Sequence, residues 1–235
     1  MASVFDTSSR SERKQQRQDR LVTLYARAWQ FFDQNSGLVY GALAALVALV
    51  LGIAGYLYYQ NQQAAAAAEA LAPVQATYAS GNYQAALGAS EGQAGLLKVA
   101  EDYGSTPAGN LARLMAADAY YNTDQPDKAL DMLADFEASE TLYGAGARAL
   151  EATIHEDREN FAQAAELYLD AAELSPTEES APNYLINAGR NFEAAGDYDA
   201  ALDAYRRVEE DYPDADAASE IPRYIARAKA RRQGG

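Results

Sequence analysis

The sequence predicts an all-α protein with one transmembrane helix near the N-terminus, then an α-solenoid of about four helix pairs closed by a C-terminal capping helix. Three observations lead to this prediction. Residues 37–59 carry no charge, the chain after them is rich in alanine, and a short motif recurs there four times. Alanine has the highest intrinsic helix propensity, and the glycine-containing hairpin signals of strands are missing.

Residues 1–36 are predicted to form a basic cytoplasmic tail, with six basic and four acidic side chains. Apolar residues recur there at helical spacing beside arginines: Leu21, Leu24, Tyr25, Ala28 and Phe32 next to Arg17, Arg20 and Arg27. This spacing suits a basic amphipathic helix on the membrane surface, or a helical continuation of the membrane span. The residues leave both alternatives open.

The uncharged stretch 37–59 is predicted to cross a membrane. As a helix it spans about 30–35 Å, which is enough for a hydrocarbon core. It is longer than the apolar core of a signal peptide, which favours an uncleaved anchor. All basic residues of the N-terminal region precede it and the next is Lys98, so the positive-inside rule puts residues 60–235 outside the cytoplasm. The anchor residues are small residues that let helices approach closely, and an interfacial tyrosine: Gly37, Gly41, Ala44, Ala48, Gly52 and Tyr59.

The net charge of −15 is unevenly distributed. Residues 60–215 hold eight basic and 28 acidic side chains, and such a surface repels nucleic-acid phosphates. Nucleic-acid binding is therefore not expected. The acidity also suits simple solubility or adaptation to a salty environment. The absence of cysteine excludes disulfides, thiolate metal sites and cysteine nucleophiles.

The recurring motif places four helix starts at Tyr83, Pro126, Phe161 and Tyr198, with offsets of 43, 35 and 37 residues. Each unit is predicted to be a helix, a tight turn and a second helix, with small residues where helices touch and aromatic residues between them. A period near 34 residues with this pattern is typical of tetratricopeptide repeats. The residues predicted to pack the repeats are Ala86, Tyr120, Ala129, Phe161, Ala164, Tyr168, Gly189, Phe192, Tyr198, Ala201 and Tyr205.

Three segments complete the predicted solenoid. Residues 60–72 continue the membrane helix outward toward the first repeat. The stretch 88–95 interrupts that repeat and accounts for its long offset. Residues 216–232 form the closing helix, with Ile221, Tyr224, Ile225 and Ala228 on one face. Some of the 17 tyrosines are expected to line the concave face where partner peptides dock, but sequence alone does not separate them from core tyrosines.

No catalytic residue, metal ligand or cofactor site is predicted. Residues 88–92 match the G-x-S-x-G nucleophile elbow, but no strand precedes them. The sole histidine, His155, occupies the repeat position of Tyr120 and Phe192 and is interpreted as a packing residue. Paired acids such as Glu178 and Glu179 lack the spacing of a calcium loop, which leaves a solvated face. An enzyme with a small-molecule substrate is therefore not expected.

Beyond these patterns, the chain resembles the YfgM-like tetratricopeptide family. The resemblance lies in the short basic tail and single span, the stretch 101–112 (EDYGSTPAGNLA), and the stretch 212–228, in which Tyr212-Pro213 precedes IPRYIARA at 221–228. It implies an inner-membrane, single-pass protein whose periplasmic domain accompanies the SecYEG translocon. The implied partners are translocon subunits, exported polypeptides or another membrane-anchored chaperone. The family has no catalytic motif to carry over, and this chain departs from it in its acidity and in the insertion at 88–95.

Two functional hypotheses follow. The first is a membrane-anchored, protein-binding scaffold that acts as an accessory, chaperone-like partner of the export machinery. The alternative is an envelope-organising adaptor that links cell-wall or division machinery through the same repeats. Repeats of this kind present extended concave surfaces to proteins, so both hypotheses use the same domain.

Overall fold

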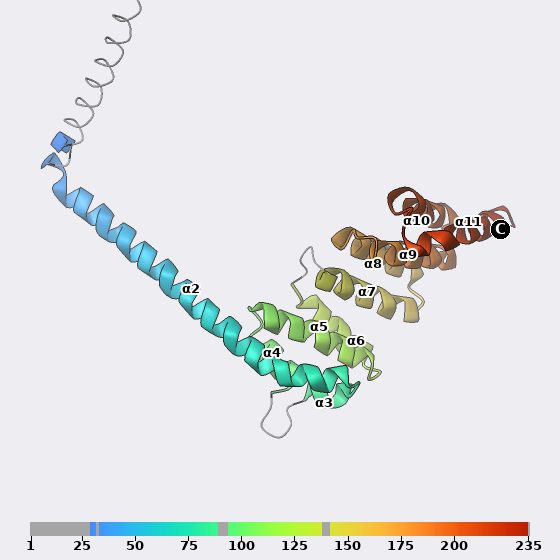
Figure 1. The fold of residues 1–235 in the computed structure, drawn as a ribbon, viewed down its shortest axis with the longest axis horizontal. Coiled ribbons are helices and arrows are strands. Elements are labelled where there is room, and N and C mark those ends of the chain that lie inside the picture. The colour runs from blue at the N-terminus through green and yellow to red at the C-terminus, as the bar shows by residue number, and fades with distance from the viewer. Residues whose placement is uncertain (1–28, 32, 89–93, 138–141, 235) are drawn as a thin grey trace, which may run out of the picture. The chain divides into compact units, whose positions relative to one another are not determined.

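Every element in the described part of the chain is a helix (Figure 1). The computed structural model describes residues 29–31, 33–88, 94–137 and 142–234. The chain divides into two compact units, Met1–Gln60 and Asn61–Gly235. The elements are α2 (Ser36–Ala79), α3 (Tyr83–Leu87), α4 (Leu96–Asp102), α5 (Pro107–Tyr121), α6 (Pro126–Ala134), α7 (Leu142–Asp157), α8 (Phe161–Leu174), α9 (Ala181–Ala195), α10 (Tyr198–Asp211), the 3₁₀ helix η1 (Asp216–Glu220) and α11 (Ile221–Gly234).

Helix α2 runs through residues 60–72 and on into the first repeat without a break, with Pro73 inside it. Proline removes one helical hydrogen bond and usually ends or kinks a helix. Here alanines 64–68 favour the helix on the N-terminal side, and Leu71 and Val74 are buried on either side of the proline. Among the described residues, α2 is the helix long and apolar enough to cross a membrane. The predicted amphipathic segment around Arg17–Phe32 lies largely outside the described residues.

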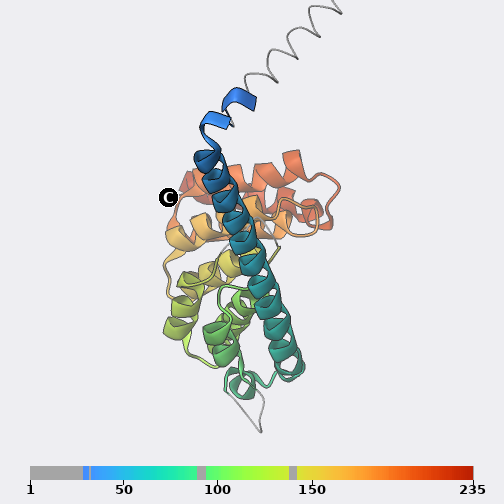
Figure 2. The same ribbon diagram turned by 90° about the vertical axis from the view of Figure 1, so that its left-hand side faces the viewer.

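The second unit is a succession of helix pairs, each packed on the next. Helix α5 packs against α6, α7 against α8, and α9 against α10, while α8 and α9 join the third pair to the fourth. Figure 2 shows the same succession from the side. The C-terminal part of α2 and the short α3 form the first pair, and Leu71 and Val74 share a core with α3, α4 and α5.

Helix α4 is not among the elements that the sequence predicts. The sequence pattern explains the long first offset by residues 88–95 alone, of which 89–93 lie outside the described residues. The structure gives the first repeat a second helix of only five residues, and α4 follows with Leu96, Val99 and Ala100 buried. These side chains recur at helical spacing, so α4 supplies the apolar face that α3 is too short to provide.

Each tight turn inside a helix pair contains a residue in the left-handed conformation, two positions before the second helix begins. The four are Gly81 (φ 78°), Asp124 (φ 60°), Glu159 (φ 61°) and Gly196 (φ 85°). Glycine adopts this conformation at no steric cost, whereas a side chain costs about 1–2 kcal/mol. The repeats therefore share one turn geometry, although only two of them use glycine for it.

These turns give a paired prediction. Replacing Glu159 by glycine is expected to raise the free energy of unfolding by about 0.5–1 kcal/mol, because the left-handed strain is removed. Replacing Gly196 by alanine is expected to lower it by about 1 kcal/mol for the opposite reason. Urea unfolding followed by circular dichroism measures both. If the two variants change the free energy of unfolding by the same amount and in the same direction, the turn conformation does not control stability.

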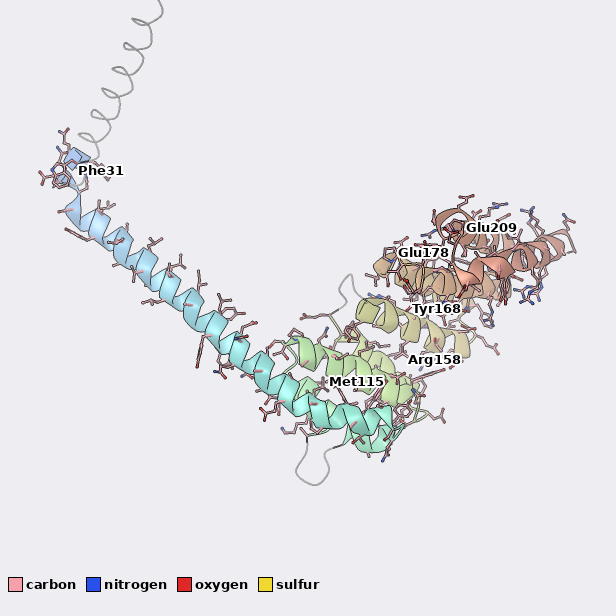
Figure 3. All side chains as sticks on the ribbon, in the orientation of Figure 1. Phe31, Met115, Arg158, Tyr168, Glu178 and Glu209 are labelled. Atoms are coloured by element: carbon pink, nitrogen blue, oxygen red, sulfur yellow. The ribbon has the colours of Figure 1, made fainter. Side chains whose placement is uncertain are left out.

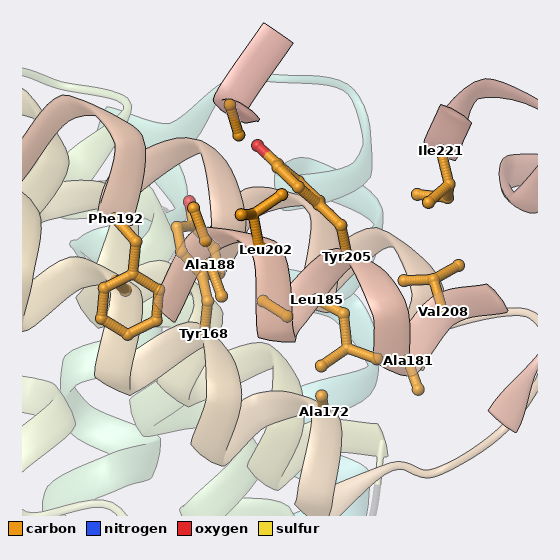
Figure 4. Close-up of a cluster of buried hydrophobic side chains, with 14 of the residues drawn as sticks. Tyr168, Ala172, Ala181, Leu185, Ala188, Phe192, Leu202, Tyr205, Val208 and Ile221 are labelled. Carbon is orange, nitrogen blue, oxygen red and sulfur yellow. The ribbon is translucent and has the colours of Figure 1, made fainter. Parts of the chain in front are cut away.

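The largest core lies between α8, α9, α10 and α11 (Figure 4). Its central residue is Tyr205, which is fully buried, and Leu185, Leu202 and Val208 are buried with it. Close packing of this kind makes the core sensitive to small changes in volume. The predicted closing helix is two elements, η1 and α11. Pro222 suits the first turn of a helix, which is consistent with the α-helix starting at Ile221 rather than at Asp216.

Candidate functional site

The first helices of the repeats present one common face, and two pockets of the second unit lie on it. One pocket is lined by Ala68, Leu71 and Gln75, which stand fifteen, twelve and eight residues before the start of α3, the second helix of the first repeat. The same count from the start of α10 reaches Asn183, Ile186 and Arg190, which line the other. Equal repeat positions occupy equivalent places in a solenoid, so both pockets open on the same face of the first helices.

The apolar pocket lies between the repeat part of α2, the first turns of α5 and the start of α7. It has a volume of about 480 Å³, within the range of ligand pockets, and none of its lining residues carries a charge. Its lining residues are Ala68, Leu71, Gln75, Pro107, Ala108, Asn110, Leu111, Phe136 and Tyr143. Among the described residues of the second unit, Tyr143 is the one large apolar or aromatic side chain that stands exposed, at 56%.

Local capping and hydrogen bonding set the position of this pocket. Thr106 caps α5 by accepting a hydrogen bond from the Gly109 backbone N–H at 3.1 Å, and Pro107 occupies the first helical position. The Asn110 side-chain amide donates to the Glu137 carbonyl at 3.0 Å, and its oxygen accepts from the Glu137 N–H at 2.9 Å. These two bonds attach the backbone of Glu137 to α5. They therefore fix the position of the neighbouring residue Phe136, which lines the pocket.

The second pocket has a different character. It has a volume of about 820 Å³ between α9, η1 and α11, and five carboxylates line it together with Arg190: Glu178, Glu179, Asp214, Asp216 and Glu220. Glu178 is labelled near the start of α9 in Figure 3. These acids include those interpreted from sequence as a solvated face. Within the described residues no group of acids and histidine is arranged to hold a metal ion.

Polar side chains link the first helix of each repeat to the helix that follows in the stack. In each repeat the linking residue stands five positions before the start of the second helix. Tyr78 donates to Asp118, Tyr121 donates to Asp157 at 2.7 Å, Glu156 accepts from Asn191 at 3.0 Å, and Glu193 accepts from Arg227 at 2.7 Å. The hydrogen bond to Asp157 raises the pKa of Tyr121 to about 12, so this tyrosine keeps its proton, and remains the donor of this bond, in moderately alkaline solution as well. These contacts fix the stacking of the first helices and therefore the spacing of the common face.

The residues predicted to pack the repeats lie away from the two pockets. Ala86, Ala129, Ala164 and Ala201 are buried where second helices meet first helices. Tyr168, Gly189, Phe192 and Tyr205 are buried around α8, α9 and α10, whereas Tyr120, Phe161 and Tyr198 are half-buried. None of these eleven residues lines the apolar pocket. The six predicted anchor residues, Gly37, Gly41, Ala44, Ala48, Gly52 and Tyr59, all lie exposed on α2.

One signal in the sequence does point to the pocket residues, although it is not part of the core pattern. Leu71 and Ile186 occupy the same repeat position, as do Gln75 and Arg190. A repeat position that changes from uncharged to charged along an array, as from Gln75 to Arg190, is a candidate for a binding face. Residues 89–92 of the G-x-S-x-G match lie outside the described part, and His155 is half-buried with Asn160 at 3.5 Å from its Nδ1.

The comparisons with known proteins agree with this architecture. A family model described as a tetratricopeptide repeat-like domain matches residues 29–216. No curated protein and no solved structure matches the chain. The family match covers most of the sequence, and the stacked helix pairs with their shared turns and alanines are those of this repeat. The chain therefore belongs to the tetratricopeptide repeat-like domain family.

Proposed function

We propose that this protein is a single-span membrane scaffold whose repeat domain binds other proteins beside the export machinery. The exposure of the apolar part of α2 carries the proposal. Its most apolar 18-residue window has a mean hydropathy of 2.4, and no share of it is buried. The large apolar side chains of the second unit are buried or half-buried, with Tyr143 as the exposed exception in the described part. Such an exposed segment is unfavourable in water and favourable in a bilayer.

The charges around the segment support one orientation. Six basic residues precede residue 37 and Lys98 is the first to follow the stretch. Under the positive-inside rule, residues 1–36 face the cytoplasm and the repeat domain lies on the other side of the plasma membrane. Tyr56, Tyr58 and Tyr59 end the stretch, where interfacial aromatic residues are favoured.

Two further observations support protein binding at an export site. A tetratricopeptide repeat-like domain is typically a non-catalytic interaction module, and the common face with its apolar and acidic pockets offers a surface for it. The resemblance of residues 101–112 and 212–228 to the YfgM-like family favours the Sec translocon, exported chains or an anchored chaperone as partners. We infer that the domain uses the common face as an accessory, chaperone-like binding module.

Cross-linking in intact cells tests the proposal. After cross-linking, the protein is purified in mild detergent and co-purifying proteins are identified by mass spectrometry. Recovery of translocon subunits, lost when residues 37–59 are replaced by an unrelated span, is the expected result. Recovery of cell-wall or division proteins without the translocon would favour an envelope-organising adaptor. A protein found only in the soluble fraction would contradict the membrane anchor itself.

A further inference from the structure

We propose that the apolar pocket binds an uncharged, apolar stretch of an extended polypeptide held at the same membrane surface. This inference rests on the proposed function, because it takes α2 as a membrane anchor. It goes further by assigning the pocket, the chemistry of its occupant and the occupant's location. Three observations carry it: the neutral lining of the pocket, the acidity of the rest of the domain, and the short chain between pocket and span.

The lining selects against charge. No acidic or basic side chain lines the pocket, although residues 60–215 hold 28 acidic residues. A charged side chain entering an apolar pocket loses hydration without gaining a partner there. An acidic occupant would also be repelled by the surrounding domain. An apolar side chain would instead cover the half-buried Leu111 and the exposed ring of Tyr143, and would gain the favourable burial of apolar surface.

The polar groups of the pocket suit an extended backbone. Asn110 makes two hydrogen bonds to the backbone of Glu137, which shows that an amide side chain at this end of α5 can pair with the N–H and C=O of one residue. Gln75 lines the pocket from α2, and its side chain is exposed to solvent there. It is therefore available to pair with the backbone of an occupant, whose side chains would lie on the apolar wall.

The covalent chain keeps the pocket close to the membrane whatever the relative placement of the two units. Ala68 lines the pocket and follows Tyr59, the last residue of the uncharged stretch, by nine positions. Even a fully extended chain of nine residues reaches only about 30 Å. A polypeptide tethered to the same bilayer therefore meets the pocket at a high effective concentration, which raises apparent affinity by roughly 10²–10⁴-fold over a free one.

The test uses the full-length protein in lipid nanodiscs with fluorescent peptides of one design. The peptide has a glycine–serine frame carrying leucine and phenylalanine, and it is presented either free or attached to a lipid of the same disc. Matched peptides replace the apolar residues by serine or by lysine. The variant Tyr143→Asp adds a charge to the apolar pocket at an exposed position, where a substitution is expected to change stability little. Asn183→Asp adds the same charge to the acidic pocket and serves as the control.

We expect the apolar peptide to bind the wild-type protein more tightly than the serine and lysine peptides. Tyr143→Asp should weaken its binding at least about tenfold, while Asn183→Asp changes it less than about twofold. Lipid attachment should strengthen binding by at least about a hundredfold. Unchanged binding by Tyr143→Asp, or tighter binding of the lysine peptide, would overturn the assignment of the pocket. Equal binding of free and attached peptides would overturn the membrane-surface occupant.

The peptide experiment distinguishes a wrong pocket assignment from a wrong proposed function. If Asn183→Asp weakens peptide binding and Tyr143→Asp does not, the scaffold binds protein at the acidic pocket and only this inference fails. If neither variant changes binding, the inference fails in the same way. The cross-linking experiment in cells decides the scaffold and its partners without reference to either pocket.

Discussion

Replacing Gly189 by alanine is expected to lower the free energy of unfolding by about 3 kcal/mol, the upper end of the usual cost of overpacking a core. Gly189 is buried in α9, directly against the ring of Tyr205. A methyl group on Gly189 would lie 2.3 Å from Cε1 and 2.6 Å from Cζ of that ring. Both distances are far inside van der Waals contact, so the ring or the helix has to move.

The ring of Tyr205 has no room to move. Its side chain is fully buried, and its hydroxyl donates to Oε1 of Glu193 at 2.8 Å. It also stacks on Tyr224, with ring centroids 5.3 Å apart. Displacing the ring would therefore break the hydrogen bond to Glu193 and the contact between α10 and α11. The cost of the added methyl group extends to the capping helix.

Urea unfolding of the full-length protein in detergent micelles, followed by circular dichroism, measures the change. Gly146→Ala is the matched control, because a methyl group added to that helical glycine would meet no atom within 4 Å. Alanine there is expected to raise stability by about 0.5–1 kcal/mol through helix propensity. The double variant Gly189→Ala/Tyr205→Leu should lose less than the sum of its single changes. A Gly189→Ala protein as stable as the wild type would refute the close approach.

Patterns within one repeat are visible in the sequence, whereas contacts between repeats are not. An alanine stands three residues after the start of each second helix, and all four of these alanines are buried. Tyr168 and Tyr205 hold the same repeat position, and each hydrogen-bonds to a carboxylate of its own first helix, Glu156 and Glu193. Local periodicity reports such packing because both partners lie in one repeat.

The apolar pocket illustrates what periodicity does not report. It brings together Leu71, Leu111 and Tyr143 from three successive repeats. Its shape depends on how far each repeat is rotated relative to the last, which no pattern within a repeat encodes. Helix α4 escapes prediction for a different reason, because it lies outside the repeated pair of helices and its seven residues hold a single set of apolar residues at helical spacing. Charged residues are also expected to be exposed by default, so the sequence does not predict the burial of Glu193.

Replacing Arg227 by methionine is expected to lower the free energy of unfolding by about 2–3 kcal/mol and to loosen the capping helix. Glu193 is buried in α9, with 2% of its side chain exposed, and Arg227 on α11 donates to both of its oxygens, at 2.7 and 3.0 Å. Removing one partner of a buried ion pair typically costs about 3–5 kcal/mol. Here Arg231, at 3.3 Å, and Tyr205 remain as partners and reduce the cost.

The control for this variant lies on the same helix. Arg223 pairs with Glu220 at 2.9 Å, but both side chains are mostly exposed. Such surface pairs contribute about 0–1 kcal/mol, so Arg223→Met should change stability little. Hydrogen exchange adds a local measurement, because faster exchange confined to α11 in Arg227→Met would show that the cap opens before the array does. Equal losses from the two variants would contradict a special role for the buried carboxylate.

The same network predicts the dependence of stability on pH. Burial alone would raise the pKa of Glu193, but hydrogen bonds from Arg227 and Tyr205 and the charges of Arg227 and Arg231 lower it below its ordinary value of 4.5. A carboxyl with a lowered pKa stabilises the folded state above its unfolded pKa, and this contribution is lost as the pH falls through the folded value. The stability advantage of wild type over Glu193→Gln should therefore be constant at neutral pH and shrink below about pH 4.5. If the difference in the free energy of unfolding persists unchanged at pH 3, the charge of Glu193 does not contribute to the stability of the folded state.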